Sequence, residues 1–346
     1  MDEQARSVSG MNDRTIRLDQ FLAQCGWSDA RRELVAGDAS NRRYDRLIRA
    51  NGETAIVMDA PPERGEDVRP FVAIAEFLHR QYLSAPQIYH QDTKDGFLVI
   101  EDLGDDLFAD LMAKDTETQL PLYRASVDVL ARLHNAPLPP LPLCDADWLM
   151  EMTGLFFDWY VPDGFDHLGE AFETAYRPLA KGVAEAERVV ILRDYHAQNL
   201  LWLPNRAGAA KVGILDFQDA LLGHPSYDLM SIMQDARRDV DPMIEAEMID
   251  YYLACTGRPR AGFLNAYAIL GLQRNLRILG IFARLCLRDG KTHYVDLIPR
   301  VWGYVMRNLE HPALQEVKNL LAPVLARPTP EFLMDLKNRC ATTPQQ

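Results

Sequence analysis

Residues 189–220 of this 346-residue chain read VVILRDYHAQNLLWLPNRAGAAKVGILDFQDA. The apolar run that opens this stretch is typical of a buried strand, and it leads directly into Asp194. Two further short strands are predicted at 200–203 and 212–215, because each is apolar and the segment between them has the Pro and Gly of a turn. The stretch therefore predicts a strand, a polar loop and a hairpin in succession.

The predicted hairpin carries a polar side chain at each of its two ends. Asn199 lies just before the first strand and Asp216 just after the second, so antiparallel pairing brings them together, with opposed Cβ atoms roughly 5 Å apart. Carboxylate and carboxamide oxygens at this separation suit Mg²⁺, which binds one or two protein oxygens plus substrate phosphates. Asp194 can lie beside such a metal and accept the proton of an attacking hydroxyl. We predict metal ligands at Asn199 and Asp216 and a general base at Asp194.

This spacing resembles the catalytic loop and the metal-binding aspartate of kinase-fold phosphotransferases. Four other segments resemble parts of the same fold, and they occur in the matching order. They are GDASNRR (37–43), FLVIEDLG (97–104), LARLHNAP (130–137) and GHPSYDL (223–229). The last two are similar to segments of the aminoglycoside phosphotransferase and choline kinase group, in which the aspartate that matches Asp228 braces the catalytic loop. The resemblance covers about residues 30–310.

The resemblance implies a two-lobed, protein-kinase-like fold of the α+β class, with a small β-rich N-terminal lobe and a large helical C-terminal lobe. Local patterns agree with it. They predict strands at about 53–59 and 97–101, an amphipathic helix at 69–82 and a largely helical segment at 243–335. We expect a flexible tail at 1–15, a nucleotide-binding lobe at 16–102 and a catalytic and substrate lobe at 103–340.

The same resemblance implies that ATP and Mg²⁺ are the cofactors. Ser40 and Asn41 belong to the segment that resembles a phosphate-covering loop. The backbone near Glu101 and Leu103 belongs to the segment that resembles the adenine-binding hinge. We expect these four residues to contact the nucleotide.

One position departs from the family pattern. Met58 stands near the place where the family has a phosphate-binding lysine, and Lys94, the one lysine of the first hundred residues, falls in a predicted surface turn. We expect an arginine to bind the phosphates instead. Arg42 and Arg43 follow the phosphate-covering loop, and period-two alternation turns only one of them inward. We choose Arg43.

Two stretches narrow the substrate, because MQDARRDV (233–240) and QRNLRILG (273–280) resemble those of bacterial cell-wall amino-sugar kinases. This resemblance implies phosphorylation of the anomeric hydroxyl of N-acetylmuramate or N-acetylglucosamine, a reaction of peptidoglycan recycling. The substrate-side candidates are His196, Gln218, Asp235, Arg238, Arg274 and Arg277. The three arginines are equal candidates to meet the lactyl carboxylate of N-acetylmuramate, since a buried arginine needs an anionic or carbonyl partner.

Two other functions stay open. The first is a kinase of the same fold that acts on a cationic small molecule, such as an aminoglycoside or choline. The formal net charge of −13, from 37 Lys and Arg against 50 Asp and Glu, would favour such a substrate. The second is a catalytically inactive module that binds a nucleotide or a sugar, which the missing lysine suggests. Intact Asp194, Asn199 and Asp216 argue against it, because a pure binder does not need all three.

Composition excludes other classes of protein. Apolar residues make up 48% and charged residues 25%, which is typical of a folded protein. The anionic balance disfavours binding to nucleic acid or anionic lipid. No apolar run approaches the roughly 18 residues that span a bilayer, and no signal-peptide pattern opens the chain. The five scattered cysteines are typical of reduced thiols. We expect a cytoplasmic monomer with a small-molecule substrate and no nucleic-acid or membrane partner.

Overall fold

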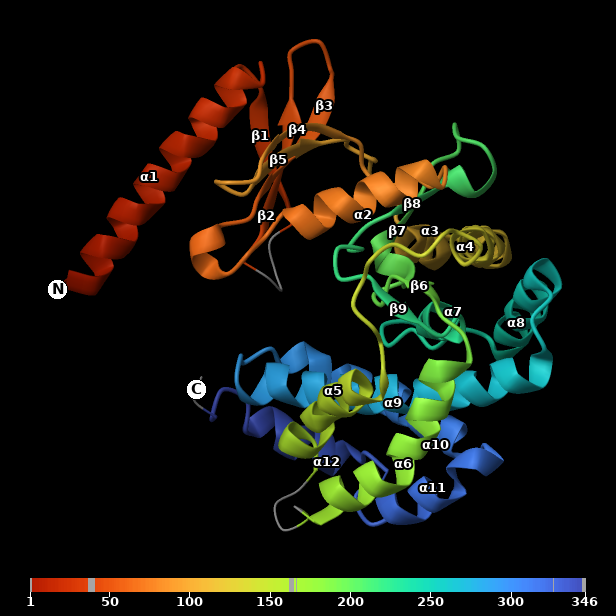
Figure 1. Ribbon diagram of the computed structural model, residues 1–346. Coiled ribbons are helices and arrows are strands. Elements are labelled where there is room, and N and C mark those ends of the chain that lie inside the picture. Colours follow the sequence, from red (N-terminus) through yellow and green to blue (C-terminus); the bar gives the residue numbers. More distant parts are fainter. Residues whose placement is uncertain (1, 37–40, 162–164, 166, 326, 344–346) are drawn as a thin grey trace. The chain divides into compact units, whose positions relative to one another are not determined.

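The computed structural model describes residues 2–36, 41–161, 165, 167–325 and 327–343. The chain forms two compact units. One, the sheet unit, comprises Met1–Leu107 and Leu201–Asp219, and the other, the helical unit, comprises Phe108–Leu200 and Ala220–Gln346. Figure 1 shows the strands β1 to β5 in the first and most of the helices in the second. The predicted combination of a small β-rich part and a large helical part is confirmed.

The sheet unit is built on five antiparallel strands in the order β1-β2-β3-β5-β4. The strands are β1 (Arg31–Ala36), β2 (Arg43–Ile48), β3 (Thr54–Asp59), β4 (Ile88–Asp92) and β5 (Phe97–Ile100). β3 and β5 confirm the strands predicted at 53–59 and 97–101. Helix α2 (Arg69–Arg80) confirms the predicted amphipathic helix, since Phe71, Ile74 and Leu78 are buried at helical spacing.

Where we expected a flexible tail at 1–15, the structure has the first part of the long helix α1 (Asp2–Gln24) (Figure 1). The C-terminal half of α1 buries Leu18, Phe21 and Leu22 against the apolar face of the sheet, which includes Val57 and Val99. Among the side chains that the structure describes, the apolar ones that hold the helix lie after residue 15. The polar sequence before them carries no apolar period of its own, so periodicity did not reveal the helix.

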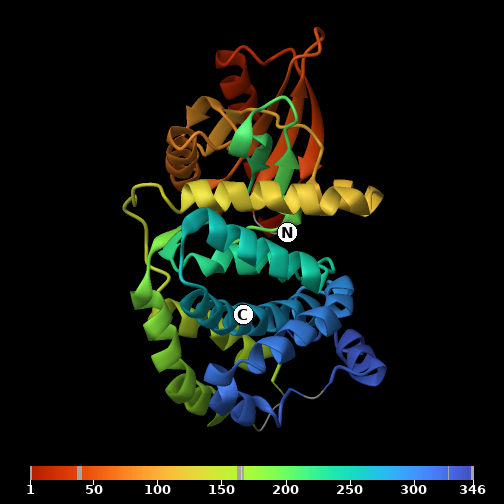
Figure 2. The same cartoon turned by 90° about the vertical axis from the view of Figure 1, so that its right-hand side faces the viewer.

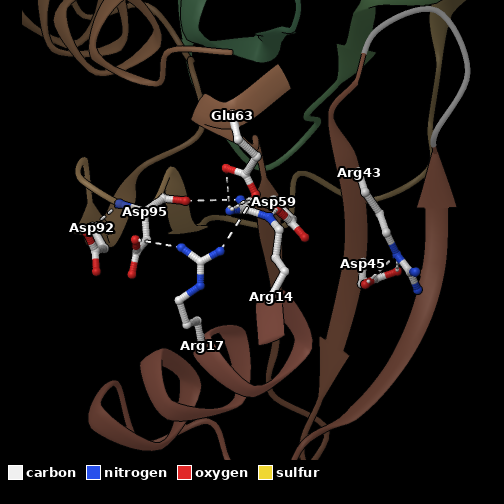
Figure 3. Close-up of polar contacts among 8 residues, drawn as sticks. All are labelled: Arg14, Arg17, Arg43, Asp45, Asp59, Glu63, Asp92 and Asp95. Atoms are coloured by element: carbon white, nitrogen blue, oxygen red, sulfur yellow. Dashed lines mark hydrogen bonds and ion pairs between the residues drawn. The ribbon is translucent and has the colours of Figure 1, made fainter. Parts of the chain in front are cut away.

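Two arginines of α1 also fasten it to the sheet unit through ion pairs (Figure 3). Arg14 donates from Nε to Asp59 at the end of β3 (2.7 Å), and its guanidinium lies 4.5 Å from the centre of the Phe97 ring. Arg17 pairs with Asp95 in the turn before β5 (3.0 Å). Since only 11% of the Arg14 side chain is exposed, the contacts of Arg14 belong to the packed interior and not to the solvated surface.

The predicted hairpin is confirmed as the paired strands β7 (Leu200–Trp202) and β8 (Val212–Ile214). From Leu201 onward it belongs to the sheet unit, which differs from the expected division of the chain near residue 102. The Ser84 hydroxyl donates to the Ala210 carbonyl (2.6 Å), and the Ile214 amide donates to the Ser84 carbonyl (2.8 Å). These bonds join segments more than a hundred residues apart, which local sequence patterns do not report.

The helical unit contains ten α-helices among its described residues. They are α3 (Phe108–Lys114), α4 (Gln119–Leu133), α5 (Ala146–Trp159), α6 (His167–Ala186), α7 (Ser226–Met233), α8 (Pro242–Thr256), α9 (Arg260–Leu287), α10 (Ile298–Leu309), α11 (Gln315–Leu321) and α12 (Pro330–Asn338). The long α9 packs against α5, α7 and α10, and α4 (yellow in Figure 2) packs against α8 (teal). Two short strands, β6 (Val189–Ile191) and β9 (Leu221–Gly223), pair antiparallel. Gly280 lets α9 touch α5, because a Cβ there would lie 2.2 Å from the Leu155 carbonyl oxygen.

Two further observations concern the whole chain. Cys286 of α9 and Cys340 after α12 form a disulfide, which corrects the expectation that all the cysteines are reduced. The two are 54 residues apart and in no recognisable motif, so the pairing could not be predicted from the cysteine spacing. Within the described ranges, no helix combines the length and the apolar character needed to cross a membrane.

Candidate active site

The loop that carries Asp194 is held by a buried carboxylate in the helical unit. Asp228 of α7 accepts hydrogen bonds from the backbone amides of Leu192 (2.6 Å) and Arg193 (3.0 Å). Arg193 has a left-handed backbone, with φ of 71°. Burial raises the pKa of Asp228 to about 7, although the two amides act in the opposite direction. Asp228 thus occupies the bracing position that the family resemblance implies.

Asp194 and Asn199 lie at the two ends of one short loop. The Asn199 side-chain Nδ2 donates to the Asp194 carbonyl (2.9 Å), and the Asn199 amide donates to the His196 carbonyl (2.9 Å). The first of these bonds fixes the orientation of the carboxamide and so the direction of its oxygen. The spacing between Asp194 and Asn199 therefore closes a tight loop in which Asn199 has a defined rotamer.

His196 and Asp235, two predicted substrate-side residues, lie beside this loop. His196 is buried, and burial lowers its pKa to about 4 in spite of the nearby Asp235 and Asp194 charges. Its ring is therefore neutral near pH 7. Asp235 accepts the backbone amide of Ala197 (3.4 Å) and that of Arg237 (2.9 Å). The structure thus brings His196 and Asp235 close to Asp194.

The sheet unit presents Asp216 directly after β8. Asp216 is exposed and has a left-handed backbone, with φ of 55°. The neighbouring Phe217 is buried and its ring lies 4.7 Å from that of Phe71 in α2. Gln218, which was predicted to face the substrate, donates from Nε2 to one carboxylate oxygen of Asp216 (2.7 Å). Gln218 therefore positions Asp216 in this structure.

Tyr44 lies on the face of the sheet that is near Asp216. Tyr44 of β2 lies opposite Met58 of β3, and burial raises the pKa of its hydroxyl, with Asp216 contributing to the rise. Arg42 hydrogen-bonds the same hydroxyl and pairs with Glu66 (2.7 Å). Tyr44, to which Arg42 is bonded, therefore lies across the strand pair from Met58, the residue that we expected near the place of the family lysine.

Arg43, our choice for the phosphate-binding cation, lies on the opposite face of the sheet from Tyr44. It pairs with Asp45 two residues along β2 (3.0 Å), as Figure 3 shows. Asp45 and Leu47 share this face, and Leu47 packs against α1. Of the two arginines, Arg42 is the one bonded to Tyr44, which lies opposite Met58.

The remaining predicted nucleotide-side residues have mixed outcomes. Ser40 lies outside the described residues. The Asn41 amide donates to Glu66 (3.1 Å). Glu101, which follows β5, pairs with Arg206 of the hairpin, and Leu103 packs near Gly213 of β8. The segment predicted to bind adenine is therefore in contact with the hairpin.

The three substrate-side arginines are in different surroundings. Arg238 lies with its guanidinium 5.9 Å from the centre of the Tyr123 ring. Arg274 is buried in α9, where its charge is affected by Asp194 and Asp235. Arg277 lies 5.9 Å from the centre of the Trp148 ring. The sequence analysis did not single out Tyr44, Glu66 and Trp148. Of these, only Tyr44 had a signal, its position two residues after Arg42.

Solved structures share this fold. A choline kinase from Streptococcus pneumoniae superposes with a TM-score of 0.61 over 86% of this chain and 99% of that chain, at 14% identity. An ADP-bound aminoglycoside phosphotransferase superposes with a TM-score of 0.55 over 86% of this chain and 92% of that one, at 13% identity. The predicted protein-kinase-like α+β fold is thereby confirmed.

Sequence comparison gives the family. The profile of the phosphotransferase enzyme family matches residues 31–264. An N-acetylmuramate/N-acetylglucosamine kinase of Caulobacter vibrioides is 43% identical over 351 aligned residues, which cover 89% of this chain and 95% of the relative. A kinase of the same name from Pseudomonas putida is 33% identical, with 90% of this chain and 96% of the relative covered. The chain belongs to the phosphotransferase enzyme family, and it is a kinase.

Proposed function

We propose that this kinase transfers the γ-phosphoryl group of ATP to the anomeric hydroxyl of N-acetylmuramate and N-acetylglucosamine. The observation that carries the proposal is the loop from Leu192 to Asn199, clamped by Asp228, in a chain whose relatives named for these two sugars align over about nine tenths of its length. Because ATP is the donor, we place the reaction in the cytoplasm.

Asp194 is the proposed general base. Its carboxylate would orient the sugar hydroxyl and accept its proton as the oxygen attacks phosphorus, and the leaving group is ADP. The amides that Asp228 binds hold the backbone before Asp194, so the carboxylate starts from a fixed position. His196 is neutral near pH 7 and is buried beside Asp194. Its proposed role is therefore a hydrogen bond to the sugar and not a charge interaction with it.

Asn199 and Asp216 are the proposed ligands of Mg²⁺. A carboxamide oxygen and a carboxylate oxygen are hard ligands that suit this ion, and both side chains are oriented, Asn199 by the Asp194 carbonyl and Asp216 by Gln218. Mg²⁺, when bound, offsets the negative charge of the phosphates. Arg42, held by Glu66 and Tyr44, is the proposed cation in place of the missing lysine.

An ADP-release assay with a panel of acceptors tests the proposed function. N-acetylmuramate and N-acetylglucosamine should support turnover, and choline and an aminoglycoside should not. Phosphorylation at the anomeric carbon removes the reducing end, so the reducing-sugar signal should fall as ADP rises. A constant reducing signal during ADP release would mean that a different hydroxyl is attacked. Turnover of choline or the aminoglycoside alone would replace the proposal by a kinase of cationic substrates.

Asp194→Asn tests the general base within the same assay. This variant should bind ATP as the wild-type protein does, because the carboxylate is proposed to act on the acceptor. Its kcat should fall by at least the roughly 100-fold that a positioned base contributes. Nucleotide binding is measured by calorimetry and turnover by ADP release. A near-normal kcat in a folded Asp194→Asn protein would remove Asp194 from this role.

A further inference from the structure

Helix α9 carries three arginines without a carboxylate partner among the described residues. Their positions, 274, 277 and 284, are separated by three and seven residues, so the side chains lie along one side of the helix. Elsewhere in the helical unit, arginines are commonly ion-paired. The paired ones include Arg124, Arg177, Arg258, Arg260, Arg288, Arg300, Arg307 and Arg339. The three arginines of α9 therefore differ from the general pattern of this acidic chain.

Arg274 is the most deeply placed of the three. Only 6% of it is exposed, and its Nη1 has no hydrogen-bond partner among the residues that the structure describes. Burial lowers the pKa of the guanidinium, Asp194 and Asp235 oppose that shift, and Arg277 adds to it. A buried cation with an unused N–H is costly unless an anion or a carbonyl group meets it.

Arg277 lies close to Arg274 and to a second unsatisfied group. The Nε of Arg277 and the hydroxyl of Tyr227 are both buried without a hydrogen-bond partner in the described ranges. Burial raises the pKa of Tyr227, and Arg277, Arg274 and Arg193 all oppose that rise, so three cations lie near one phenol. The ring centre of Trp148 lies 5.3 Å from the Arg193 guanidinium and 5.9 Å from that of Arg277.

Several unused donors and like charges thus gather at one place next to Asp194. Cations at close quarters repel one another, and an anion placed among them removes that repulsion and satisfies the N–H groups at once. A carboxylate suits them best in shape, since a planar guanidinium can bind its two oxygens with parallel hydrogen bonds. The ligand expected here is therefore small, anionic and close to the reacting hydroxyl.

We propose that Arg274 and Arg277 bind the lactyl carboxylate of N-acetylmuramate. The proposal rests on the proposed function and adds to it the residues that distinguish the two sugars. N-acetylglucosamine has the same ring and acetamido group without the lactyl ether. In N-acetylmuramate that ether is attached two ring carbons from the anomeric carbon, so its carboxylate lies close to the hydroxyl that reacts. Arg274 is suitably placed to bind it, because its charge interacts with that of Asp194, the proposed base for this hydroxyl.

Steady-state kinetics of Arg274→Gln and Arg277→Gln with each sugar test the assignment. In both variants kcat/KM for N-acetylmuramate should fall about 10- to 100-fold more than kcat/KM for N-acetylglucosamine, mainly through KM, which is the range expected for a lost charged hydrogen bond. Arg260→Gln is the matched control. Arg260 begins the same helix, is exposed and pairs with Asp250, and its replacement should leave the ratio of the two sugars unchanged.

A neutral analogue separates charge from shape. The wild-type enzyme should use the lactyl amide of N-acetylmuramate at least 10-fold less well than the acid, and the Arg277→Gln variant should treat acid and amide nearly alike. If Arg274→Gln fails to fold by thermal melting, Arg277→Gln and the amide still decide the question. Equal losses for both sugars in a folded Arg277→Gln protein, or no preference for acid over amide in the wild type, would overturn the assignment. A wild-type enzyme that phosphorylates neither sugar would instead refute the proposed function.

Discussion

Arg193, which precedes the proposed general base, and Asp216, a proposed metal ligand, both have a left-handed backbone, with φ of 71° and 55°. Such a conformation costs a residue with a side chain roughly 1–2 kcal/mol. At Arg193 the two amides bound by Asp228 offset this cost, and at Asp216 the side chain is bound by Gln218. The strain places the Asp194 and Asp216 carboxylates where straight strands would not, and strained backbone of this kind is common at functional sites.

Arg42 and Arg43 are adjacent in sequence, and we predict opposite consequences when each is replaced. Arg42→Ala should raise KM for ATP at least fivefold, because Arg42 is held by Glu66 and by Tyr44, which lies opposite Met58. Arg43→Ala should change it less than twofold, because Arg43 pairs with Asp45 on the face that packs against α1. ATP titrations at saturating sugar measure both. A larger effect at Arg43 would contradict the placement of the phosphates near Arg42.

Helix α1 is an integral part of the sheet unit, and we predict that its buried face carries most of its contribution to stability. Leu22 is 0% exposed and Ile16 is 49% exposed, so Leu22→Ala and Ile16→Ala remove similar side chains from the inner and outer sides of one helix. Leu22→Ala should lower the free energy of unfolding by about 2–5 kcal/mol. Ile16→Ala should change it by about 0.5 kcal/mol or less. Urea unfolding measures both, and equal effects would mean that α1 does not pack as described.

His224, two residues before helix α7, must stay neutral, and this makes the stability of the protein depend on pH. The Ser226 amide donates to Nδ1 of His224 (3.2 Å), so protonation of that nitrogen breaks the bond. Burial lowers the pKa of His224 to about 4, below its value near 6.5 in an unfolded chain. The unfolded state therefore binds more protons between these values. The stability that His224 contributes is complete above pH 6.5 and is lost as the pH falls toward 4.

We predict that His224→Asn makes the protein less sensitive to acid. An Asn oxygen can accept the same amide and does not titrate. Between pH 7 and pH 5 the wild-type protein should lose roughly 2 kcal/mol more than the variant, at 1.36 kcal/mol for each pH unit below the unfolded pKa. Asp228, whose raised pKa of about 7 acts in the opposite sense in this window, is present in both proteins and cancels. Parallel melting curves from pH 7 to 5 would contradict the assignment of a neutral His224.

At the scale of the whole molecule, local sequence patterns predicted the helices and strands better than they predicted which of these elements contact one another. The α2 helix and strands β3 and β5 follow from periodicity, because each buries one face or all of its side chains. The disulfide between Cys286 and Cys340 and the membership of the hairpin in the sheet unit depend on contacts between distant residues. Such contacts leave no periodic trace in either segment.

The candidate site shows the same division between local and distant information. The spacing of Asp194 and Asn199 predicted a closed loop, and the loop is present. The sequence could not decide between Arg42 and Arg43, because side chains alternate along a strand and an uncertainty of one residue in register exchanges the two faces. The crowding of Arg274 and Arg277 around Tyr227 needed the packing of α7 against α9, which only the folded chain shows.

Because the hairpin belongs to the sheet unit, the two units cannot be expressed separately by cutting the gene at one position. No single cut separates the two units, because a fragment ending at Leu107 lacks the strand that accepts and supplies the hydrogen bonds of Ser84. Leu107 and Leu201 face each other in an antiparallel bridge, so a short Gly-Ser linker can join 1–107 to 201–219. We predict that this spliced polypeptide resists protease digestion longer than the 1–107 fragment does, and equal digestion rates would contradict it. The sheet unit is thus encoded by two separate segments of the gene, and no simple truncation from either end would yield it intact.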